Sequence, residues 1–161
     1  SGKDGHLIEA EKKYHEGGID LGFVGEIKKV NPELLMVLLK QGFLPVVSPI
    51  GLGKDGITFN INADTTASRI AVSLKAYKII FMTDVDGVLD NGKLCAQITS
   101  SEVEKMIGEK IITGGMSPKV DACLYCVKNG VESAQIINGT EPHSLIAELF
   151  TDQGIGSKIV L

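Results

Sequence analysis

Short apolar runs alternate with helical segments along most of this chain, and this alternation constrains the fold more than any other feature. The runs at 43–47 (FLPVV) and 78–83 (KIIFMT) are continuous, as in strands that are covered on both faces. A helical pattern at 63–76 lies between them, and short glycine-bearing loops join the segments. The order predicts an α/β fold, with a mainly parallel sheet and helices on both faces.

Capping and helix-breaking residues set further boundaries. Asn31-Pro32-Glu33 is typical of a helix start, and Gly42 is typical of the residue that ends one. A second helix, through Ile107, can begin with a capping box made by Thr99 with Glu102 or by Ser101 with Glu104. Further strands are predicted at 22–30, 134–137 and 155–161, and further helices at 118–128 and 142–150.

Length and charge narrow the class of protein. A chain of 161 residues is predicted to form one domain, 1–161, in which the polar, glycine-rich stretch 1–20 is a loop or a hairpin. The net charge of −4 argues against a nucleic-acid-binding domain, which usually carries a basic stripe. No apolar run is long enough to span a membrane, and three cysteines do not suggest a disulfide framework. We therefore expect a cytosolic or organellar protein.

Three loops carry residues suited to ligand binding, and we expect all three at the carboxyl ends of strands, where such sheets bind ligands. The first, 60–64, holds two amides and a carboxylate at alternate positions: Asn60, Asn62 and Asp64. If extended, this stretch would present them on one side to a small polar ligand. In the alternative, Asn62 or Asp64 only caps the following helix.

The second loop, 113–119, has two glycines ahead of a helix and Lys119 about one turn inside it. Glycines permit close approach of a phosphate, and phosphoryl transfer needs a cation on the phosphate oxygens. The alternative is a flexible loop with a solvated lysine. The P-loop order of glycines, lysine and hydroxyl is absent.

The third loop, 84–90, is acidic and has two interpretations. Its backbone could hold a nucleotide at the end of the preceding strand. It also resembles the first motif of haloacid-dehalogenase-type phosphatases, which would make Asp84 a nucleophile and Asp86 a general acid, although no later acidic pair is found. Cys123 and Cys126 have C-x-x-C spacing inside a predicted helix, so we interpret them as inert thiols and predict no metal site.

Taken in order, seven segments resemble the acetylglutamate kinases of the amino acid kinase family. Each segment is a weak signal alone, but the ordered set is specific and extends over nearly the whole chain. The segments are 1–5 (SGKDG), 21–26 (LGFVGE), 30–34 (VNPEL), 60–64 (NINAD), 83–90 (TDVDGVLD), 112–119 (ITGGMSPK) and 150–156 (FTDQGIG).

The resemblance implies transfer of a phosphoryl group from MgATP to the γ-carboxylate of N-acetyl-L-glutamate, in arginine biosynthesis. It implies that Asn60 and Asn62 bind acetylglutamate, that Asp64 orients active-site lysines, and that Lys119 stabilises the transferring phosphoryl group. The nucleotide (ATP or ADP with Mg²⁺) would be held by Asp84, Val85, Asp86, Gly87, Val88, Leu89, Ile111, Ile112, Thr113, Gly114 and Gly115.

The resemblance is to the carboxyl-terminal, nucleotide-binding half of these kinases. A catalytic lysine, the phosphate-binding glycine loops and a substrate-binding arginine would lie in the other half, so we expect this chain alone to be inactive. A non-catalytic nucleotide-binding module is the alternative. Glu148 and Gly154 match positions of an arginine effector site, whereas Gln135 stands where such kinases often have His. The resemblance further implies a homo-oligomer for the full-length protein, in the cytoplasm or the plastid stroma.

Overall fold

In the computed structural model, residues 1–15, 17–151 and 154–161 are described. Contacts within the chain divide it into two compact units, Ser1–Leu74, here called the barrel unit, and Lys75–Leu161, here called the sheet unit. The sequence predicted a single domain, whereas each unit has a sheet of its own. None of the described helices is both long and apolar enough to cross a bilayer.

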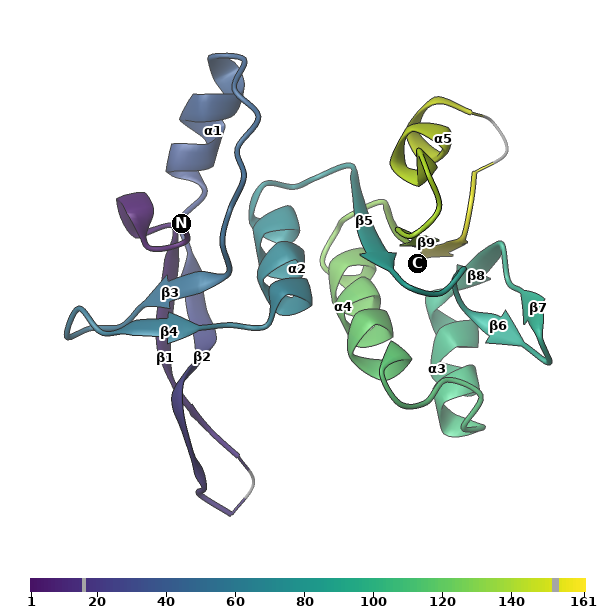
Figure 1. Ribbon diagram of the computed structural model, residues 1–161, viewed down its shortest axis with the longest axis horizontal. Coiled ribbons are helices and arrows are strands. Elements are labelled where there is room, and N and C mark those ends of the chain that lie inside the picture. The colour runs from purple at the N-terminus through teal and green to yellow at the C-terminus, as the bar shows by residue number, and fades with distance from the viewer. Residues whose placement is uncertain (16, 152–153) are drawn as a thin grey trace. The chain divides into compact units, whose positions relative to one another are not determined.

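The barrel unit is a small closed barrel in the strand order β1-β2-β4-β3 (Figure 1). The stretch predicted as a loop or hairpin contains the 3₁₀ turn η1 and strand β1, which pairs antiparallel with β2. Its residue 16 lies outside the described residues. The elements are η1 Asp4–His6, β1 Ile8–Tyr14, β2 Asp20–Val30, α1 Glu33–Lys40, β3 Ile50–Leu52, β4 Thr58–Asn60 and α2 Ala63–Ser73.

Apolar side chains from the barrel and from both helices form the core of this unit. Leu7, Ile8 and Phe59 are buried in it, and Ile70 and Leu74 from the end of α2 pack against it. The predicted helix at 63–76 is therefore confirmed, and its apolar face covers the barrel. The core list also includes Ala10, Leu35 and Ile61.

The strand predicted at 43–47 is wrong. These residues belong to no strand, and Leu44 and Val46 are 89% and 92% exposed. Pro45 has no N–H to donate to a ladder, and no strand in the described part of the chain pairs with the segment. An apolar run indicates that its side chains can be buried, but a strand also needs a second strand to accept and donate its backbone hydrogen bonds.

The sheet unit has a four-stranded sheet in the order β5-β9-β10-β8. β5 runs parallel to β9 and β10 runs parallel to β8, whereas β9 and β10 are antiparallel, so the mainly parallel sheet is confirmed here. Figure 1 shows α3 and α4 on one face and α5 on the other. The elements are β5 Lys78–Thr83, β6 Leu89–Asp90, β7 Lys93–Leu94, β8 Gln97–Thr99, α3 Ser100–Gly108, α4 Met116–Lys128, β9 Ser133–Asn138, α5 Ser144–Phe150 and β10 Ser157–Val160.

Local sequence signals mark the starts of α1 and α3. Thr99 and Glu102 form the predicted capping box of α3, and the alternative pair does not cap, because the helix already begins at Ser100. In the barrel unit the N-cap of α1 is Pro32, one residue after the Asn31 that the sequence predicted. The side chain of Asn31 still accepts a hydrogen bond from the N–H of Glu33, at 3.2 Å.

Candidate functional site

The first candidate loop lies in the barrel unit, where β4 leads into α2. Asn60 is the last residue of β4, which runs parallel to β2 and antiparallel to β3. Asn62 is the N-cap of α2, and its Oδ1 accepts from the N–H of Thr65 at 2.9 Å. The capping alternative is therefore confirmed for Asn62. Because α2 begins at Ala63, the stretch is not extended as far as Asp64, and the expectation of three side chains along one strand face is wrong.

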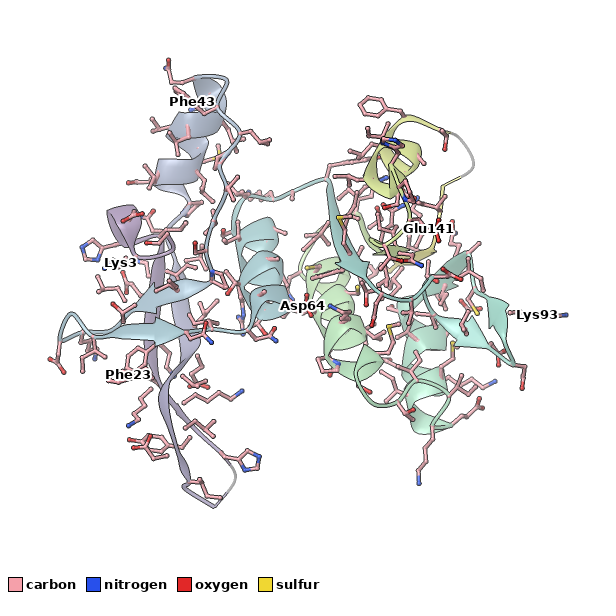
Figure 2. The ribbon with its side chains drawn as sticks, viewed as in Figure 1. Lys3, Phe23, Phe43, Asp64, Lys93 and Glu141 are labelled. Carbon is pink, nitrogen blue, oxygen red and sulfur yellow. The ribbon has the colours of Figure 1, made fainter. Side chains whose placement is uncertain are left out.

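Asp64 lies in the first turn of α2 and is half-buried, whereas Asn60 is exposed. Figure 2 labels Asp64 at this end of the helix. The positive end of the helix dipole favours a carboxylate at this position. The loop thus carries an exposed amide and a helix-stabilised carboxylate that can attract a cationic side chain.

The acidic loop, 84–90, begins at the carboxyl end of β5 in the sheet unit, as predicted. β5 pairs in parallel with β9, and Thr83 stands opposite Asn138 where both strands end. Gly139 donates its N–H to the carbonyl of Thr83 at 2.7 Å, which ties the two following loops together. Asn138 Nδ2 donates to Asp86 Oδ1 at 2.9 Å. Asn138 is therefore a positioning residue that sequence reasoning missed; its place at a strand end was the available signal.

The middle of this loop is anchored to β10. Val88 is buried and donates its N–H to Ser157 Oγ at 2.8 Å. Gly87 has φ +145°, and a Cβ there would lie 2.5 Å from the same oxygen. Only glycine fits this close approach in this backbone conformation. Exposed positions for a ligand remain at Asp84, Val85, Asp86 and Leu89.

The glycine-bearing loop, 113–119, leads into α4 in the same unit. Ile112 is buried, whereas Thr113, Gly114 and Gly115 are exposed, and Gly114 has φ +62°. The expectation that this loop follows a strand is wrong, because the connection runs from α3 to α4. Gly115 is the N-cap of α4 and provides no side-chain cap.

Lys119 is the fourth residue of α4 and is half-buried, so its prediction one turn inside the helix is confirmed. No side chain caps the start of α4, where Ser117 donates its N–H to the carbonyl of Gly114 at 3.2 Å and Pro118 has no N–H, so the ammonium of Lys119 is the group best suited to phosphate oxygens. The sheet unit therefore holds Lys119 and both segments predicted to bind nucleotide. Asn60, Asn62 and Asp64 belong to the barrel unit.

The two cysteines of the C-x-x-C spacing are buried within α4. Burial raises the pKa of Cys126 to about 11, so its thiol is neutral at physiological pH and is a poor nucleophile. In the described part of the chain, no three His, Cys, Asp or Glu side chains gather closely enough to hold a metal ion.

A pocket of about 520 Å³ lies in the sheet unit, and it brings together the two residues predicted for an effector site. The Glu148 side chain is 2% exposed; its Oε1 lies 3.2 Å from Lys78 Nζ, and its Oε2 accepts from the N–H of Ile155 at 2.9 Å. A Cβ on Gly154 would lie 3.3 Å from that carboxylate, so glycine leaves it room. The matched segment 150–156 borders this pocket; its residues 152 and 153 lie outside the described ones.

Lys78 and Lys158 of this pocket were missed as site residues, whereas Gln135 was named in the sequence only as standing where such kinases often have His. Gln135 is buried in the central strand β9, and its Oε1 has no hydrogen-bond partner among the described residues. A buried acceptor without a partner is costly, and a ligand that donates an N–H would satisfy it. The pocket thus combines a buried carboxylate, an unsatisfied amide oxygen and two lysines. All three residues lie on strands, where sequence patterns indicate burial rather than side-chain chemistry.

Comparison with known proteins gives consistent results along the chain. The sequence profile of the amino acid kinase family matches residues 1–138. The acetylglutamate kinase of Halothermothrix orenii is 53% identical over 164 residues, which cover 99% of this chain and 57% of that protein. The acetylglutamate kinase of Archaeoglobus fulgidus is 50% identical over 170 residues, covering 99% of this chain and 59% of that protein. The chain thus spans a little over half the length of these relatives.

Among solved structures, N-acetylglutamate synthase from Neisseria gonorrhoeae, complexed with coenzyme A and L-arginine, is similar to this chain with a TM-score of 0.89. It is 28% identical, and the similarity covers 96% of this chain and 36% of that one. The α/β architecture described above therefore recurs in a larger protein.

Proposed function

Because the chain belongs to the amino acid kinase family, we propose that it is part of an acetylglutamate kinase. Identity of 53% over 99% of the chain, to a relative of that name, is the observation that carries this proposal. The reaction would transfer the γ-phosphoryl group of MgATP to the γ-carboxylate of N-acetyl-L-glutamate, a step of arginine biosynthesis. The phosphatase interpretation of Asp84 and Asp86 is dropped, since the family is a kinase family.

The chemistry fits the residues of the candidate loops. A carboxylate oxygen attacks the γ-phosphorus, the bond to the bridging oxygen breaks, and ADP leaves. Both reactants are anions, so most of the catalysis must come from cations and N–H donors already in position. Lys119 would supply the cation and the exposed backbone of 113–115 the N–H donors, and Asp64 would orient a lysine.

Substrate and nucleotide would be held by different parts of the chain. Asn60 would bind acetylglutamate with its exposed amide, and Asn62 would act mainly by holding the start of α2. The exposed edge at 84–86, positioned by Asn138, would hold the nucleotide together with 111–115. Oligomeric state and location in the cytoplasm or plastid stroma stay predictions.

Calorimetric titration of MgADP into the 161-residue chain tests the nucleotide assignment. Asp84→Ala and Lys119→Ala should each weaken binding by about tenfold or more, as expected for a lost charged contact. Matched controls are Asp55→Ala, an exposed carboxylate of the barrel unit, and Lys128→Ala at the other end of α4, which should leave the affinity unchanged.

Absence of binding to a chain that circular dichroism shows to be folded would contradict the assignment, as would equal losses in the control variants. We propose that the chain alone binds nucleotide but does not phosphorylate acetylglutamate, because it matches only 57% of its relative. Turnover by the pure chain would refute that second statement and leave the first intact.

For the pocket around Glu148 we propose a second function, the binding of free L-arginine as an effector. The unpartnered Oε1 of Gln135 favours it, since a guanidinium offers five N–H donors and can serve both that oxygen and the Glu148 carboxylate. Lys78 and Lys158 could pair with the ligand's carboxylate. The similarity to a synthase that was crystallised with L-arginine supports the same ligand.

Citrulline and agmatine are informative controls for this effector. Citrulline lacks the guanidinium charge and agmatine lacks the carboxylate, so each should bind at least about tenfold more weakly than L-arginine. Gln135→Leu should weaken arginine binding without unfolding the chain, because it removes an unsatisfied polar atom. Equal affinity for arginine and citrulline, measured by calorimetry, would exclude this ligand.

A further inference from the structure

A pocket of about 640 Å³ opens at one end of the small barrel. β1 and β3 are joined in parallel at Glu9 and Leu52. Beyond this pair β3 ends and the chain turns through 53–57 into β4, whereas β1 continues to Tyr14, so the two strands part (Figure 1). Ligand sites are common in the mouths of β-barrels, and we call this one the mouth pocket. It is lined by His6, residues 9–12 of β1, Lys28 of β2, residues 52–57 and Phe59.

The deep side of the mouth pocket is apolar. Phe59 and Ala10, which line it, are 6% and 5% exposed and belong to the barrel core. A Cβ on Gly53 would lie 2.7 Å from the Phe59 ring, so glycine lets the turn pass close to the ring without a side chain that covers it. Gly53 also donates its N–H to the carbonyl of Ile57 at 2.8 Å, which closes the turn. The pocket therefore offers a fixed apolar floor to the side chain of a ligand.

The charged residues of the mouth pocket are balanced in sign. Besides His6, they are three lysines and three carboxylates: Lys12, Lys28, Lys54, Glu9, Glu11 and Asp55. Lys12 and Lys28 are already paired with carboxylates of the barrel unit. Lys54 and Asp55, neighbours in the turn, are exposed, and neither side chain has an ion pair or a hydrogen bond within the described part of the chain. Such a lining does not complement a polyanion such as a nucleotide, whereas a zwitterion can use both unpaired charges.

From these observations we propose that the mouth pocket binds a free α-amino acid with an apolar side chain. In such a molecule a single carbon joins the carboxylate to the ammonium, so two charges on neighbouring residues can serve both groups. The carboxylate would pair with Lys54 and the ammonium with Asp55, in charge-assisted hydrogen bonds. The side chain would pack on Phe59, which removes apolar surface of both from water.

This site is separate from those of the proposed function. The residues proposed to bind acetylglutamate, nucleotide and arginine do not line the mouth pocket. Asn60 follows Phe59 on β4, but successive side chains of a strand point to opposite faces, and here Phe59 is buried while Asn60 is exposed. The mouth pocket can therefore be occupied or empty independently of the kinase substrates.

Calorimetric titration of L-phenylalanine into the 161-residue chain tests this proposal. We expect saturable binding with a dissociation constant below about 1 mM. Three analogues each lack one feature: 3-phenylpropionate the ammonium, phenethylamine the carboxylate, and L-alanine the large apolar side chain. Each should bind at least about tenfold more weakly, as measured by ligand-observed NMR where calorimetry is too insensitive.

Two substitutions assign the contacts to the pocket. Lys54→Met and Asp55→Asn change exposed side chains, so both variants should fold as the parent does. Each should weaken the binding of L-phenylalanine by about tenfold. Lys54→Met should leave the affinity for phenethylamine unchanged, because that ligand has no carboxylate to lose a partner. Lys40→Met is the matched control, since Lys40 is exposed at the end of α1 and does not line the pocket.

The outcomes separate this proposal from the proposed function. No binding of L-phenylalanine to the folded chain overturns it, as does equal affinity for phenethylamine or an equal loss in Lys40→Met. Loss of binding in Gln135→Leu also overturns it, because the ligand would then lie in the pocket around Glu148. Binding of L-phenylalanine to a chain that does not bind MgADP supports the mouth pocket and contradicts the nucleotide assignment, and the reverse result does the opposite.

Discussion

Lys78→Met should destabilise the sheet unit because it leaves the Glu148 carboxylate buried without its cation. Lys78 Nζ lies 3.2 Å from Glu148 Oε1, and Met keeps an apolar side chain of similar length. Removing one partner of a buried ion pair costs about 3–5 kcal/mol, against about 0–1 kcal/mol for a surface pair. Because the Lys78 side chain is 24% exposed and the Ile155 N–H still donates to Glu148, we expect a loss of about 2–3 kcal/mol.

A double-mutant cycle separates the pair from its surroundings. Glu148→Gln removes the charge, and the partly exposed Lys78 can then turn to solvent, so the double variant should be more stable than Lys78→Met alone. Lys105→Met is the control, since the Lys105–Glu109 pair is on the surface and should contribute about 0–0.5 kcal/mol.

Urea unfolding followed by circular dichroism measures these free energies, and hydrogen exchange of β9 peptides assigns the transition to the sheet unit. A loss below about 1 kcal/mol for Lys78→Met would mean that solvent screens the pair. Additive effects in the double variant would show that the two side chains do not interact. Either result would refute the description of Glu148 as a buried carboxylate that depends on Lys78.

Three smaller perturbations test other local claims. Gly87→Ala should lower the free energy of unfolding by about 2–4 kcal/mol, because the residue has φ +145° and the added Cβ would lie 2.5 Å from an oxygen of β10; an unchanged urea midpoint would contradict this. The hydrogen bond from the Thr99 N–H holds the pKa of Glu102 below its usual range. The ionised Glu102 carboxylate therefore stabilises the fold at neutral pH, and this contribution is lost as the pH falls through the lowered pKa. Glu102→Gln should be less stable than the parent at pH 7 and equally stable in acid, as urea unfolding at the two pH values would show. Because burial raises the pKa of Cys126 to about 11, iodoacetamide should alkylate it far more slowly at pH 8 in the folded chain than in urea, as mass spectrometry would show.

Local sequence signals predicted the elements whose ends depend on a few neighbouring residues. The Thr99–Glu102 capping box and the central strand β9 are confirmed, because each follows from contacts or patterns within a few residues. The short strands β3 and β4 were missed as strands, since three residues carry too little periodicity to be recognised. Their pairing with β1 and β2 comes from residues far apart in sequence.

The residues of the candidate site were also predicted only in part from the sequence. Asp84, Asp86 and Lys119 were predicted from residue type and loop position, and Glu148 and Gly154 from the resemblance. The structure adds what these residues contact: Asn138 on Asp86, Ser157 on Val88, and Lys78 with Gln135 around Glu148.

The sequence alone determined the α/β class, the family resemblance and the residue types of the site, because periodicity, caps and ordered motifs are local properties of the chain. Tertiary structure alone decided which apolar runs are buried. Lys78–Thr83 has parallel β9 as a neighbour and becomes a strand, whereas 43–47 has no strand neighbour among the described residues, and Leu44 and Val46 stay exposed. Whether a segment is buried depends on the elements that pack against it. An apolar sequence makes burial favourable but does not supply those elements.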